Sequence, residues 1–273
     1  MTPNSTQPEP RSVLFVPATN ARALEKAKGL PCDAVVIDLE DAVGPADKDA
    51  ARDAALAGLP NFGGRAAVRI NGPGTPWGDA DLKALSGSGA LAVVLPKAGS
   101  AADVRWAGGA GLPVWAMIET LAGLIEIAAI AAEPSVSALV LGQNDLAAEM
   151  GARPGPDRTP LHLAMSQIVI HARHRGLIAL DGVYNAFQDA EGFEAECRQG
   201  RAFGFHGKTL IHPSQIAPAN AAFSPDADEI AWAEAVLAAY AQPGAEEAGV
   251  LRVDGQMIER LHLDKARRIL ARR

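Results

Sequence analysis

Cysteine is almost absent from this chain of 273 residues. The two thiols, Cys32 and Cys197, are far apart and form no CxxC pair. A disulfide framework needs several cysteines, and cysteine-based zinc sites need closely spaced ligands. The sequence therefore argues against both, and we expect two reduced thiols.

Runs of basic residues and long apolar segments are also missing. The formal net charge is −7, which argues against nucleic acid or an anionic membrane as the main partner. No apolar run approaches the roughly 20 residues needed to cross a bilayer. The start, MTPNSTQPEP, is polar and lacks the charged and apolar regions of a signal peptide. We expect residues 1–10 to be a disordered lead-in of a cytoplasmic protein.

Short apolar runs are abundant instead, with alanine-rich segments of helical periodicity between them. Continuous apolar runs are typical of parallel strands that are buried on both faces. The runs cover residues 12–18, 34–40, 66–71, 91–97, 114–119, 138–145, 178–183 and 207–212. Eight β/α units in about 210 residues predict an α/β fold of the (β/α)₈ TIM-barrel type over residues 11–223.

A doubly wound open sheet is the competing architecture. Such folds carry a glycine fingerprint after the first strand when they bind dinucleotides. Here the first apolar run is followed by PATNARA, which contains no glycine, and GPGTPWG (72–78) lacks the Lys-Ser/Thr of a phosphate loop. The barrel is therefore favoured.

The last fifty residues, 224–273, predict a separate C-terminal helical tail. Residues 226–241 have the pattern of a helix, and the Gly, Pro and charge content of 241–249 predicts a linker. Asp254-Gly255 predicts a hairpin turn, and a basic amphipathic helix is expected to follow. We expect this tail to be a lid or a subunit contact.

Polar residues close nearly every apolar run, at the barrel end where active sites lie. They are Glu40, Asp41, Arg69, Asn71, Lys97, Glu119, Asp145, Asp181 and His212. Taken singly, Lys97, Asp181 and His212 are ordinary loop or turn residues. Collectively, the carboxylates at one barrel mouth cost free energy unless they share a cation.

Oxygen ligands without a His or Cys cluster favour Mg²⁺, which binds one or two carboxylates together with water and substrate oxygens. Glu119 and Asp145 follow neighbouring strands, so we expect them to hold this ion. Arg69 is expected to bind a substrate carboxylate through two parallel hydrogen bonds.

The chain also resembles a known family. The resemblance rests on RSVLFVPATN, VVIDLEDAV, VRINGPG, VVLPK, MIETLAG, GQNDLAAEMGA, GKTLIHPSQI and VDGQMIERLH. These segments are similar to the citrate lyase β subunit-like proteins of the HpcH/HpaI aldolase superfamily, to which malyl-CoA and citramalyl-CoA lyases also belong. The resemblance implies a (β/α)₈ barrel in trimers or hexamers.

The same resemblance implies roles for individual residues. It assigns Mg²⁺ to Glu119 and Asp145, the substrate to Arg69, and catalytic acids to Glu40 and Asp41. We also expect Lys97 and Arg11 to bind substrate.

The chain departs from the family pattern at three positions. IETARG is IETLAG here, with Ala122 in place of an arginine; GAEDL is GQNDL, with Asn144 in place of an acid. The C-terminal Met-Ile-Asp, whose acid is catalytic in relatives that act on CoA thioesters, is Met257-Ile258-Glu259. The longer Glu259 is expected to favour simple cleavage over thioester hydrolysis.

These observations predict a Mg²⁺-dependent lyase. It would cleave a carboxylate-bearing 3-hydroxyacyl-CoA thioester, such as malyl-, citramalyl- or citryl-CoA, into a 2-oxo acid and an acyl-CoA, with Glu259 transferring a proton. Three alternatives remain open: the β subunit of a citrate lyase complex acting on a carrier-protein thioester, an aldolase for a free hydroxy-oxo diacid, and a catalytically weak barrel that binds a 2-oxo acid.

Overall fold

The computed structural model describes residues 9–242 and 249–273, which form two compact units. The first unit extends to Ala221, and the second runs from Ala222 to Arg273. Most of the predicted lead-in (1–8) and of the predicted linker (243–248) lies outside the described residues.

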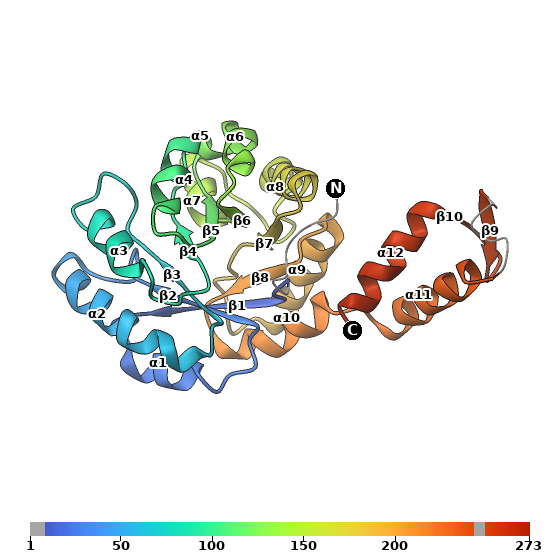
Figure 1. The fold of residues 1–273 in the computed structure, drawn as a ribbon, viewed down its shortest axis with the longest axis horizontal. Coiled ribbons are helices and arrows are strands. Elements are labelled where there is room, and N and C mark those ends of the chain that lie inside the picture. The colour runs from blue at the N-terminus through green and yellow to red at the C-terminus, as the bar shows by residue number, and fades with distance from the viewer. Residues whose placement is uncertain (1–8, 243–248) are drawn as a thin grey trace. The chain divides into compact units, whose positions relative to one another are not determined.

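Eight parallel strands close into a barrel in chain order, which confirms the predicted fold (Figure 1). The ring closes because β1 pairs with both β2 and β8. The strands are β1 (Ser12–Pro17), β2 (Ala34–Asp38), β3 (Ala66–Arg69), β4 (Val93–Leu95), β5 (Val114–Ile118), β6 (Val136–Leu141), β7 (Ile178–Asp181) and β8 (Gly207–Leu210).

Helices connect successive strands, as the alanine-rich periodic segments predict. They are α1 (Ala21–Ala27), η1 (Pro45–Asp47), α2 (Lys48–Gly58), η2 (Leu59–Phe62), α3 (Gly78–Leu85), α4 (Ala101–Gly108), α5 (Leu121–Ile125), α6 (Ile127–Ala132), α7 (Gln143–Glu149), η3 (Thr159–Leu161), α8 (His162–Arg175), α9 (Ala190–Phe203), η4 (Pro213–Gln215) and α10 (Ile216–Phe223).

The barrel interior is filled by every second residue of the strands, because successive side chains of a strand point to opposite faces. Val36, Val94, Trp115, Val140 and Leu180 belong to this buried cluster. Continuing the same alternation toward the strand ends brings polar side chains onto the inward face. The mouth of the barrel is therefore where charge replaces the apolar core.

The sixth strand differs from the prediction at its C-terminal end. The apolar run was expected to continue to Asp145, but β6 ends at Leu141, and α7 begins at Gln143. Gln143, Asn144 and Asp145 are polar, and Asp145 lies in the first turn of a helix, where a negative charge is favourable. Asp145 is thus presented by a helix rather than by the strand itself.

The second unit consists of α11 (Ala227–Tyr240), a two-stranded hairpin of β9 (Val250–Val253) and β10 (Gln256–Glu259), and α12 (Arg260–Ala271). Asp254 and Gly255 both have positive φ, as a tight hairpin turn requires, which confirms the predicted turn. Val253 and Ile258 pack with Ala233, Val236 and Ala266 from the two helices.

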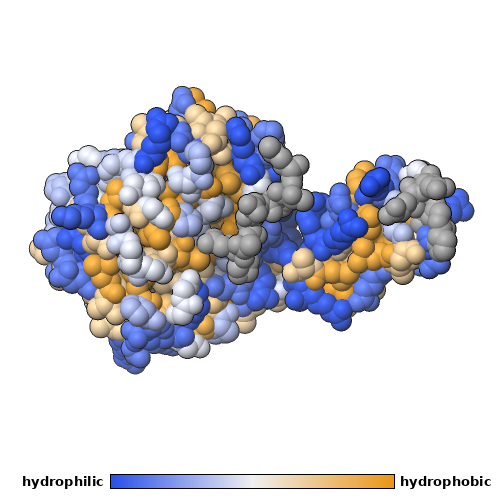
Figure 2. Space-filling model, viewed as in Figure 1, coloured by the Kyte–Doolittle hydropathy of each residue, from blue (hydrophilic) through white to orange (hydrophobic). Residues whose placement is uncertain are grey.

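The surface of the barrel is mixed in hydropathy. On the face shown in Figure 2, hydrophilic and hydrophobic residues are interspersed over the barrel. Within residues 9–242 and 249–273, we find no helix that combines the length and the apolar character needed to cross a membrane.

Candidate active site at the mouth of the barrel

Glu119 directly follows β5 and turns into the barrel rather than capping the next helix. The side chain of Thr120 caps α5 by accepting a hydrogen bond from the Gly123 amide. Glu119 itself is only 1% exposed, and its Oε1 accepts a hydrogen bond of 2.7 Å from the Lys97 amide. Helix capping therefore does not explain why Glu119 is buried.

Burial raises the pKa of Glu119 to about 7, because a carboxylate is less stable away from water. The Lys97 amide and the positive charge of Arg69 oppose this rise, whereas the negative charge of Asp145 adds to it. Glu119 and Asp145 therefore lie close enough for their charges to interact. A cation between them would relieve the repulsion.

Gly142, between β6 and α7, lets Glu119 and the helix that carries Asp145 come together. A Cβ atom at Gly142 would lie 2.2 Å from Oε2 of Glu119, so no other residue fits there without displacing the carboxylate. The close approach brings the first turn of α7 against the end of β5.

The donor set of this pair suits a hard divalent cation, because carboxylate oxygens are the ligands that Mg²⁺ prefers. In the parts of the chain that the structure describes, no group of three or more His, Cys, Asp or Glu side chains could hold a metal ion. Glu119 and Asp145 would thus leave most coordination positions to water and substrate oxygens, which is the usual magnesium arrangement.

Arg69, at the end of β3, is held by a carboxylate that sequence reasoning missed. Its Nε and Nη2 atoms donate to the two oxygens of Asp38, each at 2.7 Å. Asp38 and Arg69 are register partners on β2 and β3. We expected a substrate carboxylate to accept two parallel hydrogen bonds from Arg69, but Asp38 accepts these two bonds. The remaining nitrogen, Nη1, lies 3.1 Å from Oε2 of Glu40.

Asp38 was overlooked because it lies inside an apolar run. The strand alternation that places Ala34 and Val36 inside the barrel also places Asp38 inward, one step nearer the mouth. That alternation, combined with Arg69 on the neighbouring strand, is the signal that predicts the pair. Asp38 is 2% exposed.

Lys97 connects Glu119 to the two acids that follow β2, Glu40 and Asp41. Its amide bonds Glu119, and its Nζ forms an ion pair with Glu40 and lies 3.5 Å from Asp41. Lys97 adopts the left-handed region with φ of 49°, which is uncommon for a residue with a side chain. The structure thus brings Lys97 together with the predicted Glu40, Asp41, Arg69 and Glu119.

Glu40 and Asp41 have pKa values that are shifted in opposite directions. Burial raises the pKa of Glu40 although Arg69 and Lys97 oppose it. Burial also acts to raise the pKa of Asp41, but its hydrogen bond with Glu40 and the nearby positive charges prevail and lower it. Of these two carboxyl groups, Glu40 is therefore the better candidate for a proton acceptor.

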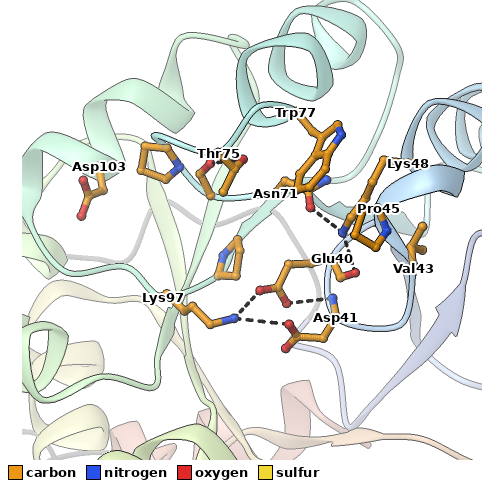
Figure 3. Close-up of a pocket in the computed structure, with 13 residues that line it drawn as sticks. Glu40, Asp41, Val43, Pro45, Lys48, Asn71, Thr75, Trp77, Lys97 and Asp103 are labelled. Carbon is orange, nitrogen blue, oxygen red and sulfur yellow. Dashed lines mark hydrogen bonds and ion pairs between the residues drawn. The ribbon is translucent and has the colours of Figure 1, made fainter.

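A cavity of about 530 Å³ adjoins the Glu40–Lys97 pair (Figure 3). The loops after β2, β3 and β4 line it, with a wall of proline and tryptophan side chains. In Figure 3, Lys97 reaches toward Glu40 and Asp41 on one side, and Trp77 lies above Lys48 on the other. The lining residues of the wall are Val43, Pro45, Pro73, Trp77 and Pro96.

The prediction that Arg11 binds substrate needs a correction. Arg11 directly precedes β1 and bonds Asp33, which precedes β2, with Nε to Oδ2 at 2.8 Å. Both residues are at the N-terminal ends of their strands, whereas the candidate site is at the C-terminal ends. A six-residue strand spans roughly 20 Å. Arg11 therefore does not belong to this site, and its contacts stabilise the opposite end of the barrel.

Asp181 and His212 have structural partners. Asp181 is fully buried and bonds Arg158 at 2.8 Å and Lys208 at 3.2 Å, and Lys208 also bonds Glu196 of α9 at 2.6 Å. Nδ1 of His212 accepts a hydrogen bond from the Ser214 amide. The contacts of Asp181 and His212 thus favour structural roles for these two residues over catalytic ones.

Asn144, where the family pattern has an acid, forms a reciprocal amide pair with Asn185. The two side chains exchange hydrogen bonds of 2.9 and 3.3 Å on the surface. Glu259 is the last residue of β10 and is exposed; its amide donates to Nδ1 of His262 at 2.9 Å. Its predicted catalytic role stays a prediction.

Comparison with known proteins identifies the family of the chain. The HpcH/HpaI aldolase/citrate lyase family matches residues 11–213. The chain belongs to this family. Among its relatives, the (3S)-malyl-CoA thioesterase of Cereibacter sphaeroides is 46% identical over 267 residues, which cover 96% of this chain and 94% of the relative. A citrate lyase subunit beta-like protein of Mycobacterium tuberculosis is 38% identical and covers 95% and 94%.

Solved structures of other proteins share the fold. CitE from Mycobacterium tuberculosis, in complex with magnesium, acetoacetate and coenzyme A, has a TM-score of 0.82 and 36% sequence identity, covering 96% of this chain and 97% of that one. RipC from Yersinia pestis has a TM-score of 0.70 and 35% identity, covering 81% and 97%.

Proposed function

We propose that the protein is a Mg²⁺-dependent carbon–carbon lyase. Its substrate would be a 3-hydroxyacyl-CoA thioester whose hydroxyl carbon also bears a carboxylate, as in malyl-CoA. The observation that carries the proposal is the buried carboxylate Glu119, which has no capping role and faces Asp145 and Arg69 at the barrel mouth. A related CitE structure with magnesium and coenzyme A, and a relative named for malyl-CoA, support the ligand class.

Glu119 and Asp145 would hold the metal ion, assisted by water and substrate oxygens. When bound, the ion would supply Lewis acidity to the hydroxyl and carboxylate oxygens of the substrate. Nη1 of Arg69 would neutralise the substrate carboxylate while Asp38 keeps the guanidinium in place.

Glu40 would accept the hydroxyl proton, since burial raises its pKa above the ordinary value of a carboxyl group. The bond between the hydroxyl carbon and the carbon next to the thioester then breaks. Its electron pair stays on the thioester fragment as an enolate, and the hydroxyl carbon becomes the carbonyl of a 2-oxo acid. Glu259 would donate the proton that completes the acyl-CoA.

Thioester hydrolysis is the second candidate, and the 46% identical malyl-CoA thioesterase favours it. The same constellation would then bind malyl-CoA, and water would attack the thioester carbonyl to release malate and CoA. The β subunit of a citrate lyase complex is a further alternative, supported by a 32% identical relative of that name from Leuconostoc mesenteroides.

A product assay separates these reactions. Purified protein is incubated with malyl-, citramalyl- and citryl-CoA, with and without Mg²⁺, beside the Glu119→Gln variant. Cleavage gives a 2-oxo acid and acetyl-CoA, whereas hydrolysis gives free CoA and an intact hydroxy acid. We expect Mg²⁺-dependent cleavage that Glu119→Gln abolishes.

Three results would contradict the lyase proposal. Release of free CoA without a 2-oxo acid would assign the thioesterase reaction. Turnover only of a carrier-protein thioester would assign the citrate lyase subunit. Binding of glyoxylate and Mg²⁺ without turnover of any thioester would leave a 2-oxo-acid-binding barrel.

A further inference from the structure

Lys48 is a buried cation that the proposed reaction does not use. It is the first residue of α2 and is 6% exposed. Its Nζ donates three hydrogen bonds: to the carbonyls of Leu39 and Glu40, both at 2.8 Å, and to Oδ1 of Asn71 at 2.6 Å. All three protons of the ammonium group are therefore directed at the ends of β2 and β3.

The choice of acceptors is informative, because all three are neutral. A buried ammonium is normally compensated by a carboxylate partner, since burial disfavours the charged form. For the same reason burial lowers the pKa of Lys48, against the attraction of Glu40, Asp38 and Asp81. The Trp77 ring covers the ammonium at 5.3 Å. Lys48 therefore fixes the backbone of Leu39 and Glu40 and does not form a simple ion pair.

A chain of hydrogen bonds extends from Lys48 to the helix layer. Asn71 donates from its amide and from Nδ2 to Oδ2 of Asp81 on α3, at 3.0 and 2.6 Å. Oδ1 of Asp81 accepts from Nε of Arg52 at 2.7 Å. Arg52 lies one turn after Lys48 on α2, so one face of this helix holds both ends of the chain.

The segment that Lys48 holds carries the candidate proton acceptor. The Glu40 amide donates to Oδ1 of Asp38 at 2.9 Å, and its carbonyl accepts from Lys48 and from the Val43 amide. With its backbone fixed at both ends, Glu40 can direct its side chain to Arg69 and Lys97.

We infer that Lys48 is a positioning residue, which places the Glu40 carboxylate against Arg69 and Lys97 through its three hydrogen bonds to Leu39, Glu40 and Asn71. This inference rests on the proposed function for the identity of the reaction. Lys48 contacts neither Glu119 nor Asp145 among its hydrogen-bond partners, so it acts on the Glu40 side of the site alone. A displacement of about 1 Å at a reacting group costs on the order of 100-fold in rate.

The test replaces Lys48 by methionine, which keeps an unbranched side chain one atom shorter and removes the three donors. We expect kcat for the thioester to fall at least tenfold, while Mg²⁺ affinity measured by calorimetry changes less than twofold. Lys83→Met, at an exposed lysine of α3, is the matched control and should keep wild-type kinetics. Circular dichroism establishes that each variant is folded.

Rescue distinguishes positioning from general stability. In Lys48→Ala, methylammonium added to the assay should restore part of kcat, because it returns the three donors to the same cavity; tetramethylammonium, which has no N–H, should not. Asp81→Asn, which weakens the hold on Asn71 while keeping the shape of the side chain, should reduce kcat to an intermediate value.

Two outcomes overturn the inference while leaving the proposed function intact. One is a folded Lys48→Met variant with wild-type kcat. The other is a kcat loss in Lys48→Ala that methylammonium and tetramethylammonium restore equally, since this would assign only space filling. By contrast, a wild-type protein that turns over no thioester contradicts the proposed function itself.

Discussion

At the scale of single residues, burial makes the charged form of Glu119 unfavourable in the folded protein. Its pKa is about 7 in the folded chain, against an ordinary value of 4.5. The unfolded chain therefore releases this proton at lower pH than the folded chain does. The contribution of Glu119 to folding stability is consequently lost as pH rises from about 4.5 to about 7.

Glu119→Gln should raise the melting temperature of the metal-free protein at pH 8, because the neutral amide avoids the cost of a buried charge and still accepts the Lys97 hydrogen bond. The gain is on the order of 3 kcal/mol, the free energy that corresponds to a pKa raised from 4.5 to about 7. Mg²⁺ should stabilise the wild type and not the variant. Thermal unfolding at pH 5 and pH 8, with and without Mg²⁺, checks both statements. A variant that is less stable than the wild type at pH 8 would contradict the assigned burial cost.

The residues that could be predicted from the sequence share one property: each lies at or near the end of an apolar run. Glu40, Asp41, Arg69, Lys97 and Glu119 were identified in this way, and the structure brings them together. Asp38 and Lys48 escaped for different reasons. Asp38 lies within an apolar run, and Lys48 opens a helix like many surface lysines, so only the three-dimensional contacts show what they hold.

At the scale of elements, the junction of β6 and α7 depends on a residue without a side chain. Gly142→Ala should displace Glu119 and destabilise the protein by about 1–3 kcal/mol, the usual cost of overpacking. Mg²⁺ binding should be lost at the same time, as calorimetry would show. Gly29→Ala is the matched control, because a Cβ there meets no atom within 4 Å. Unchanged Mg²⁺ affinity in Gly142→Ala would show that the carboxylate can move without harm.

The buried ion network beside β7 and β8 is a second element-scale feature. Lys208→Met leaves Asp181 and Glu196 with one cation, Arg158, so we expect a loss of about 3 kcal/mol. Urea unfolding measures it. Lys28→Met, which removes an ion pair to the exposed Glu25, is the comparison and should cost less than about 1 kcal/mol. Equal losses in the two variants would refute the distinction between buried and surface pairs.

At the scale of the whole molecule, the fold was predictable and the strand ends were not. Each of the eight apolar runs overlaps one strand, because burial on both faces marks parallel strands strongly. Their ends depend on local contacts, and β6 stops at Leu141 because a helix begins directly after Gly142. Arg11 is a different case: it precedes the first apolar run, so chain direction alone places it at the N-terminal end of β1, opposite the candidate site.

The prediction for the whole molecule concerns its assembly and the C-terminal unit. We propose that the protein assembles into trimers or hexamers and that Glu259 completes the reaction. Glu259→Gln should lower kcat at least tenfold and leave the binding of Mg²⁺ and glyoxylate unchanged. Stopped-flow and calorimetric measurements separate the two effects. Sedimentation should give a mass of three or six times 28.3 kDa. Wild-type kcat in Glu259→Gln would remove this residue from the mechanism.

The crowding of acids at the barrel mouth has a consequence for kinetics. Asp38, Glu40, Asp41, Glu119 and Asp145 lie at that end of the barrel beside the cations Lys48, Arg69 and Lys97, so these five acids outnumber the three cations. A thioester that bears a carboxylate approaches this negative potential as an anion. Its entry is favourable once a divalent cation has joined the acids, so the two ligands should bind in a compulsory order, with the metal first and the thioester second.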